Sequence, residues 1–229
     1  QINLAIAGIA VGTVSLPVLS KAFKSKNFLK VSNIQNRSIQ LSLLLSIPAS
    51  MGLIIASDEI INGLFGYGSF TTKDVELTSK ALMLFGFGVI AFALVKILSN
   101  FFFARDNTKT PFYISLVSVL LNIFISVYFF KEVGFIIIPI ATTISSWFNL
   151  VLLFLILKKR NLFNFNKIFI KLFFRIIIAT LLMGLFFNYL ILLFSEQLSF
   201  EYSFKSIYLI LSVILGLSFY LLTSYLIKA

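Results

Sequence analysis

The residues from Ala81 to Ala104 form an apolar run of 24 residues that contains a single charge, Lys96. An α-helix rises about 1.5 Å per residue, so this run would be about 36 Å long. The hydrocarbon core of a bilayer is about 30 Å thick, and a helix of this length and composition crosses it. We therefore predict a membrane-spanning helix here, and the remainder of the chain must be compatible with a membrane protein.

Lys96 lies well inside this predicted span, nine residues before Arg105. About 13 Å of helix separates the two residues, and snorkelling covers only part of that distance. A lysine that faces lipid at depth costs about 2.5–3.5 kcal/mol, so such residues usually face a bundle interior or a wet cavity. Asn100 lies one turn further on the same face. Two interpretations stay open: a structural lysine that snorkels or pairs with a neighbouring helix, or a cation on the path of an anionic cargo.

The composition excludes several classes of protein. The chain is 59% hydrophobic, with a mean hydropathy of +1.04, whereas soluble domains are about 45–50% apolar. It contains neither Cys nor His, which excludes disulfides, thiolate chemistry, imidazole catalysis and the usual zinc sites. There is no glycine-rich phosphate loop followed by Lys and Ser or Thr. We therefore expect no metal and no cofactor.

Seven apolar segments of membrane-spanning length can be drawn, and they predict an all-α integral membrane protein. They are residues 1–20, 38–56, 81–104, 112–130, 134–157, 172–194 and 206–227. We expect three parts: a transport lobe of residues 1–157, a cytoplasmic basic linker of residues 158–171, and a terminal transmembrane helix pair within residues 172–229. Because the chain opens with Gln1 inside an apolar segment, we expect a fragment of a longer protein.

The charges separate cleanly when seven crossings are assumed. One side then holds 14 basic residues and one acid, and the other holds four basic residues and seven acids. The positive-inside rule makes the first side cytoplasmic. We predict that residues 21–37, 105–110 and 158–171 are cytoplasmic, and that residues 57–80 and 195–205 are periplasmic. The net charge of +11 therefore reflects topology, with contact to anionic lipid headgroups, and does not indicate nucleic acid.

Several local patterns predict the connections between the spans. Residues 21–37 are expected to form an amphipathic surface helix. The spacing of Ile60, Ile61, Leu64 and Phe65 fits a short interfacial helix, which Gly66 and Gly68 would end. Thr71 or Thr72 with Asp74 is expected to cap the helix that follows. The three residues 131–133 are expected to join two spans in a tight antiparallel hairpin.

Small residues and prolines inside the spans predict packing and kinks. Gly8 and Gly12 form a GxxxG pattern that allows helix backbones to approach closely. Pro17 and Pro48 each lie inside or at the last turn of a predicted span, where proline kinks a helix.

The hairpin spans carry several polar residues, including Asn122, Ser126 and Thr142. Such side chains usually hold helices together, and a cation-binding pocket is the alternative. The pocket lacks support from any carboxylate, because no Asp or Glu lies inside a predicted span. The same absence leaves no candidate for paired-carboxylate catalysis in the membrane. A membrane cation among proline-interrupted helices is more typical of secondary transporters than of enzymes.

Four stretches together resemble the MurJ/MviN lipid II flippases of the multidrug/oligosaccharidyl-lipid/polysaccharide exporter superfamily. They are GIAVGTVSLPVLSKAF (8–23), SIPASMGLIIASDEIINGLFGYGSFTTKD (46–74), LVKILSNFFFARDNTKTP (94–111) and the fifth segment as far as Trp147-Phe148-Asn149. The order and spacing of these stretches match the family pattern. The resemblance covers residues 1–160 by motif and the terminal helix pair by position only.

The resemblance implies a fourteen-helix flippase with two six-helix lobes and a terminal helix pair, of which this chain would be spans eight to fourteen. The N-terminal half of the same protein would then be its partner. The cargo implied is lipid II, an undecaprenyl pyrophosphate precursor of peptidoglycan, moved across the bacterial inner (cytoplasmic) membrane by alternating access. Lys96 matches the family lysine in a cationic cavity. Coupling to an ion or to the membrane potential stays open.

Two residues depart from the family pattern: Asn3 replaces a common Pro, and Ser126 is weaker than the polar or acidic residue of some relatives, which puts a sodium site in doubt. Three rival interpretations remain. A polysaccharide-repeat or multidrug exporter would belong to the same superfamily, but residues 94–111 argue against it. A membrane-embedded glycosyl- or acyltransferase would need catalytic polar groups at a membrane face, where few acids are available. A non-transporting scaffold subunit would leave Lys96 unexplained.

Overall fold

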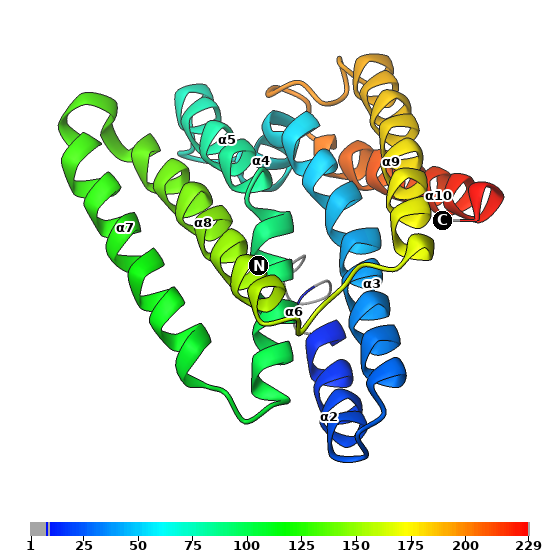
Figure 1. Cartoon of the computed structure of the whole chain (residues 1–229). Coiled ribbons are helices and arrows are strands. Elements are labelled where there is room, and N and C mark those ends of the chain that lie inside the picture. Colours follow the sequence, from blue (N-terminus) through cyan, green and yellow to red (C-terminus); the bar gives the residue numbers. More distant parts are fainter. Residues whose placement is uncertain (1–7, 9, 229) are drawn as a thin grey trace. The chain divides into compact units, whose positions relative to one another are not determined.

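The computed structural model describes residue 8 and residues 10–228, and over these residues it contains helices and no strands. The helices are α2 (Val11–Lys24), α3 (Phe28–Ile55), α4 (Ser57–Phe65), α5 (Thr72–Gly86), α6 (Val89–Phe103), α7 (Lys109–Val133), α8 (Ile137–Lys159), α9 (Lys167–Leu193) and α10 (Lys205–Ile227), with a short 3₁₀ helix at Gly134–Ile136 (Figure 1). The predicted all-α class is confirmed.

Five helical stretches of the described chain are long and apolar enough to cross a membrane. They are Phe28–Ile55, Thr72–Phe103, Lys109–Lys159, Ile168–Leu193 and Lys205–Ile227. The third stretch is 51 residues long and contains both α7 and α8. Six of the seven predicted spans therefore coincide with parts of these stretches to within one residue at each end. The first predicted span, residues 1–20, lies partly outside the described residues.

The chain divides into two compact units. Unit 1 consists of residues 1–46 and 88–173, and unit 2 consists of residues 47–87 and 174–229. Helices α3 and α9 each begin in unit 1 and continue into unit 2. The predicted division into a lobe, a basic linker and a terminal pair concerns transport roles, and it stays a prediction.

Unit 1 is built on α6, which packs against α8 and α2. Its buried face is large and apolar, and the side chains of Ile97, Phe101 and Phe102 are fully buried. Helix α8 contributes Leu153 and Leu157, which are also fully buried. Burying a side chain of this size gains about 1.5–3 kcal/mol, so the α6–α8 contact is the main apolar core of this unit.

Helices α7 and α8 form the predicted antiparallel hairpin and lie side by side in Figure 1. The turn lies three residues later than expected, at Gly134–Ile136, because α7 continues to Val133. Gly134 has a φ of 71°, a backbone conformation that a residue without a Cβ adopts without strain. The outer helix α7 buries only Pro111, Ile114 and Ser118, as expected for a helix that borders lipid.

Three helices of unit 1 end in the same motif. At the ends of α2, α6 and α8, the residues Lys26, Asp106 and Asn161 adopt positive φ values of 53–57°. In each case the next amide donates to a carbonyl five residues back; Asn27, for example, donates to Ala22 at 3.2 Å. This Schellman arrangement satisfies carbonyls that a helix end leaves free.

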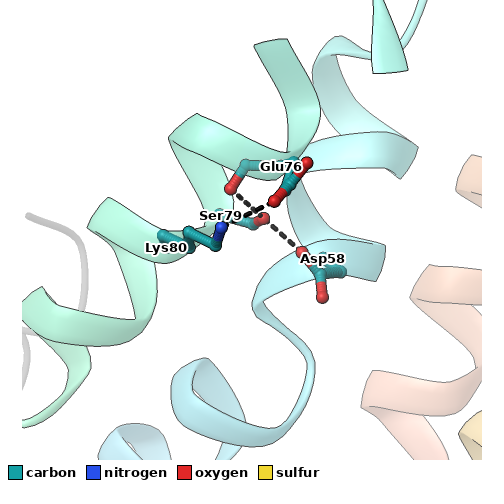
Figure 2. A network of polar contacts seen from close by, with 4 residues as sticks. All are labelled: Asp58, Glu76, Ser79 and Lys80. Atoms are coloured by element: carbon teal, nitrogen blue, oxygen red, sulfur yellow. Dashed lines mark hydrogen bonds and ion pairs between the residues drawn. The ribbon is translucent and has the colours of Figure 1, made fainter. Parts of the chain in front are cut away.

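Unit 2 contains a short helix α4, Ser57–Phe65, where the sequence predicts one, followed by a capped α5. The interfacial position of α4 stays a prediction. The predicted cap is confirmed: the Thr71 hydroxyl accepts from the Asp74 amide, and the Asp74 carboxylate accepts from the Thr71 amide at 2.9 Å. Figure 2 shows how α5 attaches to α4, through the buried Ser79 hydroxyl that donates to the Asp58 carboxylate. Lys80 pairs with Glu76 at 2.6 Å beside it.

Two expectations about connections need correction. A separate surface helix at residues 21–37 is wrong, because α2 runs to Lys24 and α3 begins at Phe28, which leaves a turn of three residues. The predicted span 81–104 is interrupted at Phe87–Gly88, between α5 and α6. Glycine has a low helix propensity. Gly86 directly precedes the interruption and Gly88 lies in it. Within the predicted basic linker, residues 158–171, the non-helical stretch is residues 160–166.

Candidate functional site

Lys96 lies on α6, eight residues into the helix, and its side chain is exposed in this chain. The residues one turn away, Phe92 and Asn100, are half-buried, and Phe103 two turns away is exposed. The opposite face of α6 forms the core of unit 1. The ammonium group is therefore carried on the one stripe of α6 that the described part of the chain leaves uncovered.

Asn100 connects α6 to α2. Its amide nitrogen donates to the carbonyl of Gly12 at 2.8 Å. A Cβ at Gly12 would lie 3.0 Å from that same nitrogen, so a larger residue there would push the two helices apart. Asn100 thus borders the Lys96 stripe with its amide N–H committed to a backbone carbonyl, and its role toward a cargo stays a prediction.

The polar residues of the hairpin form a seam between α7 and α8. The amide nitrogen of Asn122 lies 3.2 Å from the Thr142 hydroxyl and 3.3 Å from the Ser145 hydroxyl. Asn149 on α8 donates to Ser115 on α7 at 3.3 Å in the same way. Ser126 is half-buried one turn beyond Asn122. These N–H donors occupy hydroxyl lone pairs that a cation would need, so the geometry fits helix packing, while the cation site stays a prediction.

The remaining candidates have structural positions. Gly8 is buried, and its neighbours Gln1–Ala7 and Ile9 lie outside the described residues. Pro17 and Pro48 lie inside α2 and α3, respectively. Their kinks stay predictions. In the described part of the chain, no group of three or more Asp and Glu side chains is arranged to hold a metal ion.

Arg105, at the end of α6, joins three elements of unit 1. Its guanidinium donates to the Leu162 carbonyl at 2.8 Å and to the Phe101 carbonyl at 2.6 Å. It also lies 4.1 Å from the ring centroid of Phe23, at the end of α2. Burial lowers the pKa of Arg105 from its ordinary value to about 10, so the group stays cationic at neutral pH.

Helix α3 holds the same connection from its other side. The side-chain amide of Gln35 donates to the Leu162 carbonyl at 3.2 Å, and that of Asn36 donates to the Asn164 carbonyl at 3.0 Å. Both amides are buried. The non-helical residues 160–166 are therefore fixed to unit 1 by side chains from α3 and from the end of α6, although the sequence predicts a basic linker over residues 158–171.

Lys205, the first residue of α10, is buried in unit 2, and nothing in the sequence indicates this. Its side chain is only 1% exposed. Its ammonium donates to the Asn62 side-chain oxygen at 3.0 Å, the Gly66 carbonyl at 2.6 Å and the Phe200 carbonyl at 2.7 Å. The rings of Tyr67 and Phe200 lie 4.5 and 4.4 Å from it. All three N–H donors of the ammonium group are thus paired with oxygen atoms, and two aromatic rings lie against its charge. No carboxylate is among these partners.

A shallow hollow of about 310 Å³ adjoins this lysine cage in unit 2. It shares Asn62 and Phe200 with the cage, and it is lined further by Asp58, Glu59, Thr72, Val75, Glu76 and Leu198. Burial raises the pKa of Glu59, and the nearby Asp58 carboxylate raises it further. The three acids come from the consecutive helices α4 and α5, and the sequence shows them as charges of one external connection. It does not reveal that Leu198 and Phe200 of the α9–α10 connection line the same hollow, because that connection is far from α4 and α5 in the sequence.

Comparison with known proteins gives the family. A family model described as "Lipid II flippase MurJ" matches residues 1–211. Among curated proteins, the chain is 34% identical over its whole length to a probable lipid II flippase MurJ from Rickettsia prowazekii, of which it covers 45%. It is 37% identical over 161 residues to the corresponding protein of Rhizobium tropici, which covers 70% of this chain and 30% of the relative.

A solved structure agrees. The chain is similar to a structure described as lipid II flippase MurJ in an inward closed conformation, with a TM-score of 0.78 and 26% identity. The match covers 98% of this chain and 44% of that one. The chain therefore spans less than half the length of the relatives with which it aligns over its full extent. The family model matches residues 1–211, and the relative from Rickettsia prowazekii is 34% identical over the whole chain. The chain therefore belongs to the lipid II flippase MurJ family and is a multi-pass membrane protein.

Proposed function

We propose that the chain is the C-terminal part of a lipid II flippase of the bacterial inner membrane, a transporter and not an enzyme. Family membership supports the cargo, and the match to less than half of each full-length relative supports the assignment as one part of the transporter. The N-terminal half of the same protein would supply the rest of the transport path. The cargo would pass from the cytoplasmic to the periplasmic leaflet by alternating access.

The observation that carries this proposal is the exposed Lys96 on a membrane-length apolar stretch. Among the described residues of its own unit, no element covers that stripe of α6. A lysine at membrane depth is costly when it faces lipid, so the stripe fits the wall of a wet cavity better than the lipid boundary. A pyrophosphate that enters such a cavity meets a point charge in a medium where electrostatic attraction is stronger than in water.

The experiment replaces Lys96 in the full-length protein and measures lipid II flipping per folded molecule in reconstituted vesicles. Lys96→Ala and Lys96→Glu should lower flipping strongly, with the charge reversal the more severe. Lys96→Arg should retain part of the activity, because the charge stays while its shape and hydration change.

Lys131→Glu is the matched control, because Lys131 is also exposed in unit 1 but lies in the last turn of α7. It reverses the same charge and should leave flipping unchanged. Normal flipping per molecule by Lys96→Glu would rule out contact between Lys96 and the cargo. Equal losses in both variants would mean that the protein responds to net charge and not to the position of Lys96.

The proposed topology is tested separately. The chain has no cysteine, so single cysteines report cleanly on their side of the membrane within this part of the protein. A cysteine at Ser25 should be protected from an impermeant reagent in intact cells, and one at Ser69 should react. The reverse pattern would overturn the assignment of residues 21–37 to the cytoplasm.

A further inference from the structure

The turn between α2 and α3 is short and firmly held. The Lys26 amide donates to Phe23 at 2.9 Å, and the Asn27 amide donates to Ala22 at 3.2 Å, which closes the end of α2. The Asn27 side chain then accepts from the Lys30 amide at 3.0 Å and caps the start of α3. Because both helix ends are closed, the side chains of the turn project in fixed directions.

Two large apolar side chains project from this turn without cover. Phe28 is 71% exposed and Leu29 is 82% exposed, and they are the first two residues of α3. Leaving them in water forgoes the favourable free energy of burying two large apolar side chains. A pair of this kind at a helix start is typical of a segment that enters the boundary between lipid headgroups and acyl chains.

The same turn carries an uncompensated positive charge. Lys24, Lys26 and Lys30 are exposed, and the first acid in the sequence is Asp58. In the described part of the chain, the recorded ion pair is Lys80 with Glu76, which leaves the three lysines of the turn without a carboxylate partner. An adjacent apolar pair and three free ammonium groups complement a surface that is negative outside and apolar beneath.

We propose that the α2–α3 turn, residues 24–30, docks on the anionic lipid surface of the bilayer. Phe28 and Leu29 enter the acyl boundary, and the three lysines contact lipid phosphates. A soluble acidic partner would satisfy the lysines but leave the apolar pair exposed, whereas a neutral apolar partner would leave the lysines unpaired. A phospholipid bilayer with anionic headgroups provides for both groups of side chains. Its headgroups attract each lysine, and its acyl chains cover the apolar pair.

The test places a fluorophore at Ser25→Cys in the full-length protein, reconstituted in phosphatidylcholine bilayers that contain a minor fraction of phosphatidylglycerol. A nitroxide quencher is carried on the headgroup of either lipid in parallel samples. Quenching should report enrichment of phosphatidylglycerol at the turn by about fivefold, the factor expected from one lysine near an anionic surface. High salt should reduce this enrichment.

Two variants divide the proposal. Lys24→Gln/Lys26→Gln/Lys30→Gln should abolish the enrichment, whereas Phe28→Asn/Leu29→Asn should move the fluorophore toward water, as measured by quenchers at graded depth. The matched control, Lys73→Gln/Lys80→Gln/Lys131→Gln, removes the same charge from exposed positions elsewhere and should change neither readout.

Equal quenching by the two lipids, or enrichment that persists in the first variant, would overturn the proposal. Shielding of the fluorophore from both lipid and aqueous quenchers would also overturn it, because a protein surface would then cover the turn. None of these outcomes depends on flipping, so the proposal and the transport function fail separately.

Discussion

Two lysines, one in each unit, lie in environments opposite to those that their sequence neighbours suggest. Lys96 is surrounded in the sequence by apolar residues, and its side chain is exposed in unit 1. Lys205 is preceded by a polar connection, and its side chain is fully buried in unit 2 among three oxygen acceptors and two aromatic rings. Acceptors supplied by distant segments decide whether a lysine is buried, and the hydropathy of its sequence neighbours does not.

The difference also separates two uses of a positive charge. Lys205 has every donor paired, so it stabilises the junction of α4 with α10 and has no N–H left for a ligand. Lys96 keeps its donors free of recorded partners in this chain and can offer them to a cargo. Substitution should therefore affect stability at Lys205 and function at Lys96.

Lys205→Met should have the largest effect. It leaves the oxygens of Asn62, Gly66 and Phe200 without their donor in a buried site, and unsatisfied buried groups cost about 1–3 kcal/mol each. We expect a loss of about 3 kcal/mol or more, seen as a lower thermal midpoint of the purified full-length protein. Lys73→Met, at an exposed position of the same unit, is the control and should change little. A midpoint equal to that of the control would mean that the cage contributes nothing to stability.

Gly66→Ala should have the next largest effect, because it crowds the same cage without removing the charge. An added Cβ would lie 2.6 Å from the Asn62 carbonyl oxygen and 3.1 Å from the Lys205 ammonium. Overpacking of this kind typically costs about 1–3 kcal/mol. Gly52→Ala is the control, since a Cβ there meets nothing within 4 Å. Equal thermal midpoints of the two variants would mean that the loop at Gly66 moves to make room for the added methyl group without a loss of stability.

The features that the sequence predicted correctly are those encoded by neighbouring residues. The short helix α4 follows from an apolar repeat of one helical turn, and the Thr71–Asp74 cap follows from a spacing of three residues. The α7–α8 hairpin follows from the short gap between two apolar runs. Each needs only local periodicity or capping chemistry, which are visible in a single sequence.

The features that sequence reasoning missed depend on residues far apart in the chain. The partners Asn62 and Lys205 are separated by 143 residues, and Gln35 reaches Leu162 across 127. The sequence does not reveal the three-residue turn at residues 25–27. The basic residues on both sides of the turn indicate a cytoplasmic connection, and the expectation was that this connection forms a surface helix. Lys96 was found because its charge interrupts an apolar run, a local signal, but the run itself could not reveal which side of α6 is covered.

Asn100→Ala should have a moderate effect and tests whether the border of the Lys96 stripe is structural. It removes one hydrogen bond to the Gly12 carbonyl between α6 and α2, worth about 1 kcal/mol. The thermal midpoint should fall slightly, with Asn188→Ala, at an exposed position on α9, as the control. A loss of flipping that exceeds the loss of folded protein would instead assign Asn100 to the cargo path.

Lys96→Ala should have the smallest effect on stability. The side chain has no recorded partner to lose, and alanine is at least as good a helix former, so the free energy of unfolding should change by no more than about 0.5 kcal/mol. The measurement is the thermal midpoint and folded yield of the full-length protein, beside Lys205→Met in the same preparation. A loss as large as that of Lys205→Met would mean that the proposed N-terminal half pairs with Lys96 structurally. The two lysines would then differ only in which part of the protein supplies their acceptors, and the argument for a cargo contact would lose its support.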